Sequence, residues 1–586
     1  MSRRSIHRFL LAIPLAVAVL VPRGPATRVA AADGPGGGST LMSALDAELT
    51  RSAEKLRDAG AAPLYFLAYR ATEASQVAIA ASYGVVADES EGKSRQLDVE
   101  ARVGSPQLDN THALRESFEF GGGTVVSRSL PVDEDPAAIR AAAWLATDQA
   151  WKSAQERLVK VKTNRGVKVE EEDSSDDFAI APPQRAAEPS GELAFDRDAW
   201  RERVKRLSAS FRAEPLILDS AVVLSAASSR RTILTSEGTR IETGDVHTRL
   251  IIQASTKADD GMDLELSDII DAENPDGLPD EKTLDARVRD LARRVLELRA
   301  APIVEPYAGP AIVMNRAAAV FFHEIFGHRM EGHRQKSEEE GQTFTKKVNQ
   351  SVMPEFLSIV DDPTLASFGG VPLNGYYRFD DEGVAAEKVN LVESGILRSF
   401  LMSRSPIENF PRSNGHGRCS PGRAPVSRQG NLVVSSKNTV PFAKLREMLI
   451  AELKERGLPY GLVFHDISGG FTTTQRSGPQ AFKVIPLYVQ RVYVDGRPDE
   501  VVRGVDLVGT PLATLSRIEA TADDPAVFNG VCGAESGWVP VSAIAPSLLV
   551  AEIEIEKKEK GQERPPLLPP PAHDPAAAET EKGGAK

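Results

Sequence analysis

The residues of this sequence that could do chemistry are concentrated in residues 315–333, which read NRAAAVFFHEIFGHRMEGH. Three of the chain's nine histidines, His323, His328 and His333, fall within this segment. Imidazoles gathered on one element are typical of a metal site, because the neutral ring is a common zinc ligand. Glu324, directly after His323, has the type and position of a base that takes a proton from water. We therefore expect a zinc site here.

The spacing of the first two histidines is unusual for a helix. The Ala-rich segment predicts one, with Asn315 as its N-cap and Gly332 as its C-terminal stop. His323 and His328 are five residues apart, which on an ideal helix separates them by about 140°. Two rings so placed cannot reach one ion at about 2.1 Å. We therefore predict a single wide turn with i→i+5 bonding at Gly327, which brings the rings back together.

A third ligand cannot be chosen from spacing. Catalytic zinc takes three protein ligands and keeps one position open. The available groups are Glu331, His333, His416, His465, Cys419 and Cys532. The chain has only these two cysteines, and a disulfide between them is the alternative use outside the cytoplasm. The simpler alternative for the whole segment is that its His and Glu residues only decorate an amphipathic helix.

Length and changes of pattern predict two domains with irregular ends. Residues 1–31 combine arginines, an apolar run and small residues, which indicates a cleaved export signal. Arg3 and Arg4 suggest the twin-arginine route, so a periplasmic or extracellular location is expected. The remaining divisions are a linker at 32–40, an N-terminal α/β domain at 41–304 with an acidic disordered insertion at about 170–193, a β-rich domain at 305–555 and a disordered tail at 556–586.

Apolar periodicity predicts the main elements. Helical spacing is found at residues 42–58, 197–213 and 282–299, and the Ala-rich segment 136–161, which has no internal Pro or Gly, predicts a further long helix. Strands are predicted at 63–85, 221–226 and 249–254. The second half contains short strands at residues 356–360, 386–392, 397–402, 430–434, 482–494 and 548–555. The fold class is therefore α+β: an α/β domain followed by a mainly antiparallel β domain that carries the zinc-ligand helix.

Charge and hydropathy exclude some classes of partner. The net charge of −13 and the pI near 5.4 argue against a nucleic-acid binder, which needs clustered Lys and Arg. The apolar run at residues 9–21 is too short to span a bilayer, and no other stretch is long enough. No nucleic acid and no stable membrane insertion are therefore expected.

The motifs around and after the histidines resemble the TldD/PmbA family of peptidases, specifically its zinc-bearing TldD-like members. The H-E-x-x-x-H signature is HEIFGH at 323–328, followed by FDDEG at 379–383, ESGIL at 393–397, SNGHGR at 413–418, GVCG at 530–533 and VPV at 539–541. The resemblance covers about residues 310–555. It implies that Cys532 is the third ligand of one Zn²⁺ per chain, with Glu331 and His333 as supporting groups around the ligands. Cys419 has no counterpart in this pattern.

The resemblance also implies an activity and partners. It suggests a zinc peptidase that hydrolyses unfolded or extended polypeptides by zinc-activated water with Glu324 as general base. A homodimer, or a heterodimer with a related zinc-free subunit, is implied as well. An extended peptide fits a β-rich domain because it can add as a strand to a free edge. Candidates for the cleft are Ser468, Gly469, Gly470 and His416. The alternatives are a non-catalytic peptide-binding partner subunit and a zinc amidase of the cell envelope.

Overall fold

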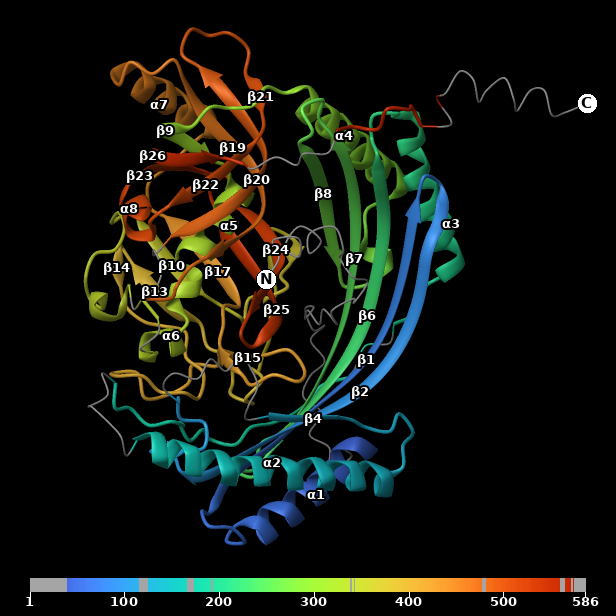
Figure 1. Ribbon diagram of the computed structural model, residues 1–586, viewed down its shortest axis with the longest axis vertical. Coiled ribbons are helices and arrows are strands. Elements are labelled where there is room, and N and C mark those ends of the chain that lie inside the picture. Colours follow the sequence, from blue (N-terminus) through green and yellow to red (C-terminus); the bar gives the residue numbers. More distant parts are fainter. Residues whose placement is uncertain are drawn as a thin grey trace, which may run out of the picture.

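The computed structural model describes residues 39–114, 125–165, 173–189, 191, 193–337, 340–341, 343–476, 481–558, 564–570 and 573. The chain forms two β-rich halves that lie side by side (Figure 1). The predicted signal at 1–31 and most of the predicted linker and tail fall outside the described residues. Within the described ranges, no helix combines the length and apolarity that a membrane crossing needs.

The first half is built on a curved sheet of eight strands. They are β1 (Leu64–Ser82), β2 (Val85–Ser105), β3 (Leu108–Asp109), β4 (Val125–Ser129), β5 (Arg185–Ala187), β6 (Asp219–Thr235), β7 (Arg240–Lys257) and β8 (Asp263–Ala272). The order is β3-β2-β1-β6-β7-β5, with β4 on β2 and β8 on β7. All pairings are antiparallel except that of β5 with β7. The predicted α+β class is confirmed, but this sheet is not the parallel one of an α/β domain.

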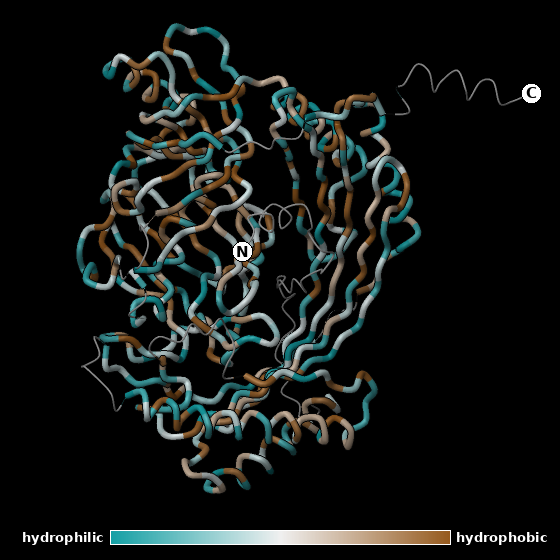
Figure 2. The backbone as a smooth tube through the Cα atoms, in the orientation of Figure 1, coloured by the Kyte–Doolittle hydropathy of each residue, from teal (hydrophilic) through white to brown (hydrophobic). Residues whose placement is uncertain are grey.

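Four helices cover the two ends of this sheet, as Figure 1 shows. They are α1 (Thr40–Leu56), α2 (Pro136–Arg165), α3 (Arg197–Ala209) and α4 (Glu281–Ala300), with short turns η1 (Ser210–Ala213) and η2 (Pro275–Gly277). Their bounds match those of the predicted helices to within a few residues. In α4, the Asp280 side chain accepts the Thr283 N–H, and Leu284, Val288 and Leu291 are buried on one face. Figure 2 shows apolar and polar residues alternating along the long strands.

Part of the insertion predicted to be disordered is ordered. Of residues 170–193, the structure describes 173–189, 191 and 193, and β5 adds three of them to the sheet. Phe178 is 2% exposed, with its ring centroid 4.7 Å from that of Phe66. The Ala179 N–H donates to the Arg404 carbonyl at 2.8 Å. One buried aromatic ring and backbone pairing thus order a segment whose composition predicts disorder.

Arg404 ties the two halves together and is 1% exposed. Its terminal nitrogens donate to both Glu237 oxygens at 2.8 and 2.6 Å, and its Nε donates to the Ala179 carbonyl at 2.8 Å. We expect Arg404→Gln to lower the free energy of unfolding by about 3 kcal/mol, because Glu237 would lose a bidentate partner in a largely buried place. Urea unfolding followed by fluorescence measures the change.

The matched control for this prediction is Arg398→Gln. Arg398 also pairs with a carboxylate, that of Glu393, but its side chain is 39% exposed. Its loss should cost within about 0.5 kcal/mol, as for other surface substitutions. Equal losses in the two variants would contradict the role given to Arg404.

The second half contains a small closed barrel. Its five strands are β9 (Tyr307–Val313), β19 (Tyr460–Thr472), β20 (Phe482–Tyr493), β22 (Val505–Gly509) and β26 (Leu548–Lys557), and it closes because β9 pairs with both β19 and β26. At its margin lie β18 (Thr439–Val440), β21 (Glu500–Val502), β23 (Ile518–Ala522), α7 (Phe442–Glu455) and α8 (Pro511–Ser516).

A six-stranded sheet faces this barrel across a helix (Figure 1). Its order is β14 (Ile396–Leu397), β13 (Val389–Glu393), β10 (Leu357–Asp361), β17 (Asn431–Ser436), β25 (Gly537–Ala545) and β24 (Ala526–Ala534). Two small hairpins accompany it, β11 (Ser367–Phe368) with β12 (Val371–Pro372) and β15 (Gly417–Arg418) with β16 (Val426–Ser427). The predicted strand at 397–402 is wrong beyond residue 397, since 398–402 join no strand.

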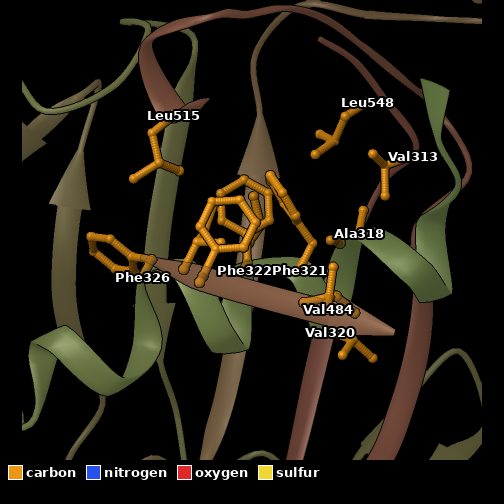
Figure 3. Packing of buried hydrophobic residues seen from close by; sticks show 14 of the residues in the cluster. Val313, Ala318, Val320, Phe321, Phe322, Phe326, Val484, Leu515 and Leu548 are labelled. Carbon is orange, nitrogen blue, oxygen red and sulfur yellow. The ribbon is translucent and has the colours of Figure 1, made fainter. Parts of the chain in front are cut away.

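The helix between the two sheets is α5 (Asn315–Ile325), which carries the first two site residues. All its residues from 317 to 325 are buried, as expected for a helix that is apolar on every side. Figure 3 shows Phe321 and Phe322 packing among side chains of the barrel. Phe321 meets Phe482 edge to face with ring centroids 5.7 Å apart. A helix so enclosed holds His323 and Glu324 in fixed positions.

Candidate metal centre

The chain between the two histidines leaves the helix and does not bulge. Helix α5 ends at Ile325, Phe326 has φ −120° and ψ −52°, and a 3₁₀ turn, η3 (Gly327–Met330), follows. The predicted i→i+5 turn is therefore wrong, although the two rings do meet, with centroids 5.0 Å apart. A Cβ at Gly327 would lie 1.8 Å from the Gln429 Oε1, so a close approach explains this glycine.

The predicted ends of this helix are also wrong. Met314 takes the cap position and accepts the Ala318 N–H at 2.6 Å. Asn315 is inside the first turn, where its side-chain amide donates to the Asp524 carbonyl at 2.8 Å. Gly332 does not stop the helix but precedes another one, α6 (His333–Lys336). Tertiary contacts decide these ends, and they are invisible in the local sequence.

Three side chains from distant parts of the chain converge on one point. The ligand atoms of His323, His328 and Cys532 all lie within 4.8 Å of one another, and all three residues are buried. The Cys532 Sγ is 3.2 Å from the His323 Nε2 and 3.3 Å from the His328 Nε2. Tetrahedral zinc, with bonds of about 2.1 Å to N and 2.3 Å to S, separates such atoms by about 3.5 Å. Two imidazoles and one sulfur at these distances fit a zinc ion with a fourth position open.

Cys532 lies on β24, and its charged neighbours favour the thiolate form of its side chain. Burial opposes its ionisation, but His328, Arg428 and His323 together hold the pKa of this thiol well below its usual value. Both cysteines are free, so the alternative disulfide is excluded. A thiolate is the form of cysteine that binds zinc.

Glu331 contacts the candidate ligand His328, and Arg428 contacts the candidate ligand Cys532. Glu331 is fully buried, with its carboxylate oxygens 3.2 and 3.3 Å from the His328 Nδ1. Arg334 donates to it at 2.8 Å, and the Arg428 Nε lies 3.3 Å from it. Arg428 also donates to the Cys532 carbonyl at 2.8 Å. A carboxylate on the second ring nitrogen fixes the orientation of a histidine ligand, which directs the His328 Nε2 to the metal.

Arg428 was not predicted from the sequence, and no local pattern marks it. It follows β16 and is separated from Cys532 by about a hundred residues, yet it is fully buried against both Cys532 and Glu331. Only the folded chain shows that one guanidinium links the sulfur ligand to the carboxylate behind a histidine ligand.

Glu324 lies beside the ligand set without joining it. Its Oε2 is 4.0 Å from the His328 Nε2, and the residue is 6% exposed. Burial raises its pKa above the usual value of a carboxyl group. Strand β19 passes directly over it, since a Cβ on Gly470 would be 2.9 Å from the Glu324 Cγ. Glu324 therefore has the position of a base next to the open coordination site.

Among the described residues, Cys419 and the other histidines do not join the candidate ligand set. His333 pairs with Glu535, and His465 accepts or donates a hydrogen bond at Gln490. His416 is fully buried and contacts Asp361 and Asn414, so its predicted place in a substrate cleft is wrong. Cys419 lies beside Arg70 and Asp98, where burial raises the pKa of its thiol to about 12.

The Gly-rich segment of β19 does lie at the site. Ser468 is exposed, Gly469 has open space around its Cα, and Gly470 faces Glu324. Arg329 anchors the end of this strand, donating to the Thr472 hydroxyl and to the Thr473 carbonyl at 3.2 Å. The strand is thus held against Glu324 by a residue of η3.

In sequence, this chain resembles proteins that are named metallopeptidases or metalloproteases. The model of the PmbA/TldA metallopeptidase C-terminal domain matches residues 307–557. A metalloprotease of Archaeoglobus fulgidus is 32% identical over 252 residues, 42% of this chain and 53% of that protein. One from Methanocaldococcus jannaschii is 26% identical over 369 residues, 62% of this chain and 73% of that protein. The chain thus spans about half of the first relative and nearly three quarters of the second.

The name of one curated relative includes zinc. A protein of Saccharolobus solfataricus, called a zinc metalloprotease TldD homolog, is 27% identical over 43% of this chain and 52% of its own length. Among solved structures, TldE of Thermococcus kodakarensis has a TM-score of 0.57 at 14% identity, covering 87% of this chain and 99% of that chain. A Bacteroides thetaiotaomicron protein has the same fold, with a TM-score of 0.59. Residues 307–557 therefore form a C-terminal domain of the TldD/PmbA family of metallopeptidases, and the described chain has the fold of TldE.

Proposed function

We propose that this protein is a zinc-dependent peptidase that cleaves unfolded or extended polypeptides, with one Zn²⁺ per chain. The observation that carries the proposal is the meeting of the His323, His328 and Cys532 ligand atoms within 4.8 Å, beside a buried Glu324. Two imidazoles and one thiolate leave a coordination position open, which distinguishes a catalytic zinc site from a structural one.

The reaction divides between the metal and the residues around it. When bound, zinc supplies Lewis-acid chemistry that polarises the scissile carbonyl and activates water. Glu324 accepts the proton of the attacking water and returns it to the leaving amine. His323, His328 and Cys532 hold the metal, and Glu331 keeps the His328 ring in place.

Two strand edges at the site favour an extended substrate. Among the described residues, β24 pairs only with β25, which leaves the edge that carries Cys532 open. Residues 466–472 of β19 pair only with β20, since β9 pairs no further than Phe464. A peptide that adds to such an edge forms main-chain hydrogen bonds whatever its sequence, and it needs to be unfolded to do so.

Exposed aromatic side chains lie near both edges, Phe471 on β19 itself and Trp538 on β25, the neighbour of β24. Phe471, next to Gly470, is 57% exposed, and Trp538, paired with Gly533 beside Cys532, is 61% exposed. Large apolar side chains left in water at a cleft are typical of a binding surface. They would contact the apolar residues that an unfolded chain displays and a folded protein hides.

The test measures zinc and then proteolysis with the full chain. Elemental analysis should give one zinc per chain. The loaded protein should cleave a labelled unfolded protein and spare the same protein when folded, and a chelator should stop cleavage until zinc is returned. Zinc without any peptide cleavage would favour a zinc amidase of the cell envelope. A chain that binds peptide but no zinc would be the non-catalytic partner subunit.

Substitution of Gly470 tests the contact between β19 and the base. In Gly470→Ala the new Cβ would lie 2.9 Å from the Glu324 Cγ and 2.7 Å from the Lys483 carbonyl, so Glu324 or the strand must shift. We expect kcat to fall about 100-fold, the loss that a misplacement of about 1 Å can cause, with zinc content unchanged. Initial rates on the unfolded substrate measure it.

Gly469→Ala is the matched control for Gly470→Ala, because a Cβ at that neighbouring glycine meets nothing within 4 Å. It should keep kcat within about twofold of the unsubstituted chain. If both alanine variants behave alike, the contact of Gly470 with Glu324 has no part in the reaction.

We also infer a location and an assembly. Arg3, Arg4 and Arg8 before the apolar run at 9–21 support export, and the mature chain should begin near residue 32 when its N-terminus is sequenced. The resemblance supports a second subunit, either another copy or a related zinc-free chain. Native mass spectrometry of the exported protein tests this, and a monomer alone would contradict it.

A further inference from the structure

A polar cavity lies between the two halves, away from the ligands. Its volume is about 480 Å³. One wall is formed by β8 and one face of α4, and the other by Arg316 of α5 and Asp466 of β19. The charged residues that line it are Asp268, Arg287, Asp290, Arg294, Arg316 and Asp466. Its size is enough for one or two side chains of a bound peptide.

Three elements lead from this cavity to the metal centre. On α5, Arg316 precedes His323 by two turns on the same face, about 10 Å along the axis. On β19, Asp466 precedes Gly470 by four residues, about 13 Å of strand. On β24, Phe528 precedes Cys532 by four residues, and the Arg316 guanidinium lies 5.3 Å from the centre of its ring. Helix and strands therefore place the cavity about 10 to 13 Å from the ligands.

That distance corresponds to three or four residues of an extended peptide, at about 3.3 Å per residue. Two of these three elements, β19 and β24, also carry the open strand edges of the proposed substrate site. A peptide lying along β19 with its scissile bond at Glu324 would therefore reach the cavity with its third or fourth residue.

The acidic residues of the lining already have partners. Both Asp268 oxygens accept from Arg287 at 2.6 Å, and Asp290 accepts from Arg293 at 2.5 Å. One oxygen of Asp466 accepts from the Arg316 Nε at 3.2 Å and from the Ile467 N–H at 3.0 Å. Each carboxylate of the lining is thus matched by an arginine.

Two basic residues of the lining have N–H donors that make no hydrogen bond to the described residues. Arg294 lies 4.7 Å above the Tyr488 ring and donates to no acceptor in the part of the chain that the structure describes. Within the same residues, the two terminal nitrogens of Arg316 likewise have no acceptor. Glu297, one turn further along α4 and outside the lining, accepts from Arg293 and Tyr488. The charged groups of the cavity that remain available for hydrogen bonding are therefore guanidinium N–H donors, among them those of Arg294 and Arg316.

We propose that this cavity binds a carboxylate of the substrate, three to four residues from the scissile bond, through Arg294 and Arg316. The proposal rests on the proposed peptidase function and adds a preference to it. Two guanidinium groups with free N–H donors suit a carboxylate, which accepts two or more of them at once. The carboxylate comes either from the C-terminus of the peptide or from an Asp or Glu side chain.

The experiment separates binding from cleavage. Affinities are measured calorimetrically with the full-length, zinc-loaded Glu324→Gln chain and four matched peptides. One pair differs only in a free or amidated C-terminus, and the other, amidated throughout, differs only in one internal Glu or Gln. A carboxylate should bind about tenfold more tightly than its neutral counterpart, the gain of a charge-assisted hydrogen bond. The pair that shows the difference identifies the source of the carboxylate.

Further substitutions in the same background locate the effect. With Arg294→Gln or Arg316→Gln the affinity ratio should fall to about one. Arg289→Gln is the matched control, since this exposed arginine of α4 is outside the lining and pairs with Asp285, which is also outside it, and it should keep the ratio. In the active chain, mass spectrometry should find the cleaved bond three to four residues from the carboxylate.

The outcomes distinguish the two proposals. Equal affinities for charged and neutral peptides, or a ratio that survives both arginine substitutions, overturn the carboxylate site. Cleavage of the peptides with no such preference leaves the peptidase standing and removes only this site. Conversely, a preference that depends on Arg294 and Arg316, in a chain that cleaves no peptide, keeps the site and overturns the peptidase.

Discussion

Replacing Glu324 by glutamine should lower kcat on an unfolded polypeptide by ~10³-fold or more while zinc stays bound, because general base catalysis contributes up to about 10⁴-fold. The glutamine has the same size, so the buried position beside His323 and β19 remains filled. It cannot accept the proton of the attacking water. None of the three proposed ligands is changed, so zinc content and thermal stability should match those of the unsubstituted chain. Rates, elemental analysis and a melting curve measure the three quantities.

A carboxylate elsewhere provides the control for the Glu324 substitution. Glu552 on β26 pairs with Arg517 at the surface, and its substitution by glutamine should leave kcat within about twofold. Retention of more than a tenth of the activity in Glu324→Gln would show that another group takes the proton. Loss of zinc from that variant would instead assign Glu324 to the ligand set, against its position 4.0 Å from the His328 Nε2.

The sequence was most informative where a signal is local. The HEIFGH segment predicts two candidate ligands and a candidate base because all three lie within six residues, and the structure brings these side chains close together. Helices α1, α3 and α4 follow from apolar spacing, which reports the face that packs on the sheet, and α2 follows from its alanine-rich composition. Local periodicity thus predicts which elements exist, and the long β strands pair largely with their sequence neighbours.

Local reasoning failed where a distant contact decides the conformation. The predicted wide turn at Gly327 ignored Gln429, which occupies the space beside it, and the chain instead breaks at Phe326. Phe178 orders a segment that composition alone marks as disordered, because its partners Phe66 and Arg404 come from elsewhere in the chain. Such contacts depend on the three-dimensional arrangement, which no window of sequence contains.

The third ligand illustrates the same limit within the site. Cys532 follows His323 by 209 residues, so spacing left six candidates, and only the resemblance to a family selected one. Part of its environment was also beyond prediction, since Arg428 reaches the Cys532 carbonyl only through the fold and links it to Glu331. The structure explains the choice physically: of the two cysteines, Cys532 lies beside two imidazoles, whereas Cys419 lies beside Arg70 and Asp98.

This difference between the two thiols makes Cys532→Ser the sharpest test of the metal centre. Loss of a group that merely supports a ligand costs about 10- to 100-fold in metal affinity, so loss of the ligand itself should cost more than ~100-fold. A serine hydroxyl stays protonated at neutral pH and gives zinc no thiolate. Competition with a chelator of known affinity measures the zinc Kd, and peptidase activity should be lost with the metal.

Cys419→Ser is the matched control, because it makes the same atomic change at the only other cysteine. Burial raises the pKa of the Cys419 thiol to about 12, so it stays protonated, and it lies beside Arg70 and Asp98 and far from any imidazole pair. Its zinc Kd should be that of the unsubstituted chain. If Cys532→Ser keeps that Kd as well, the sulfur is not a ligand, and two histidines alone would leave the site short of the three protein ligands that catalytic zinc requires.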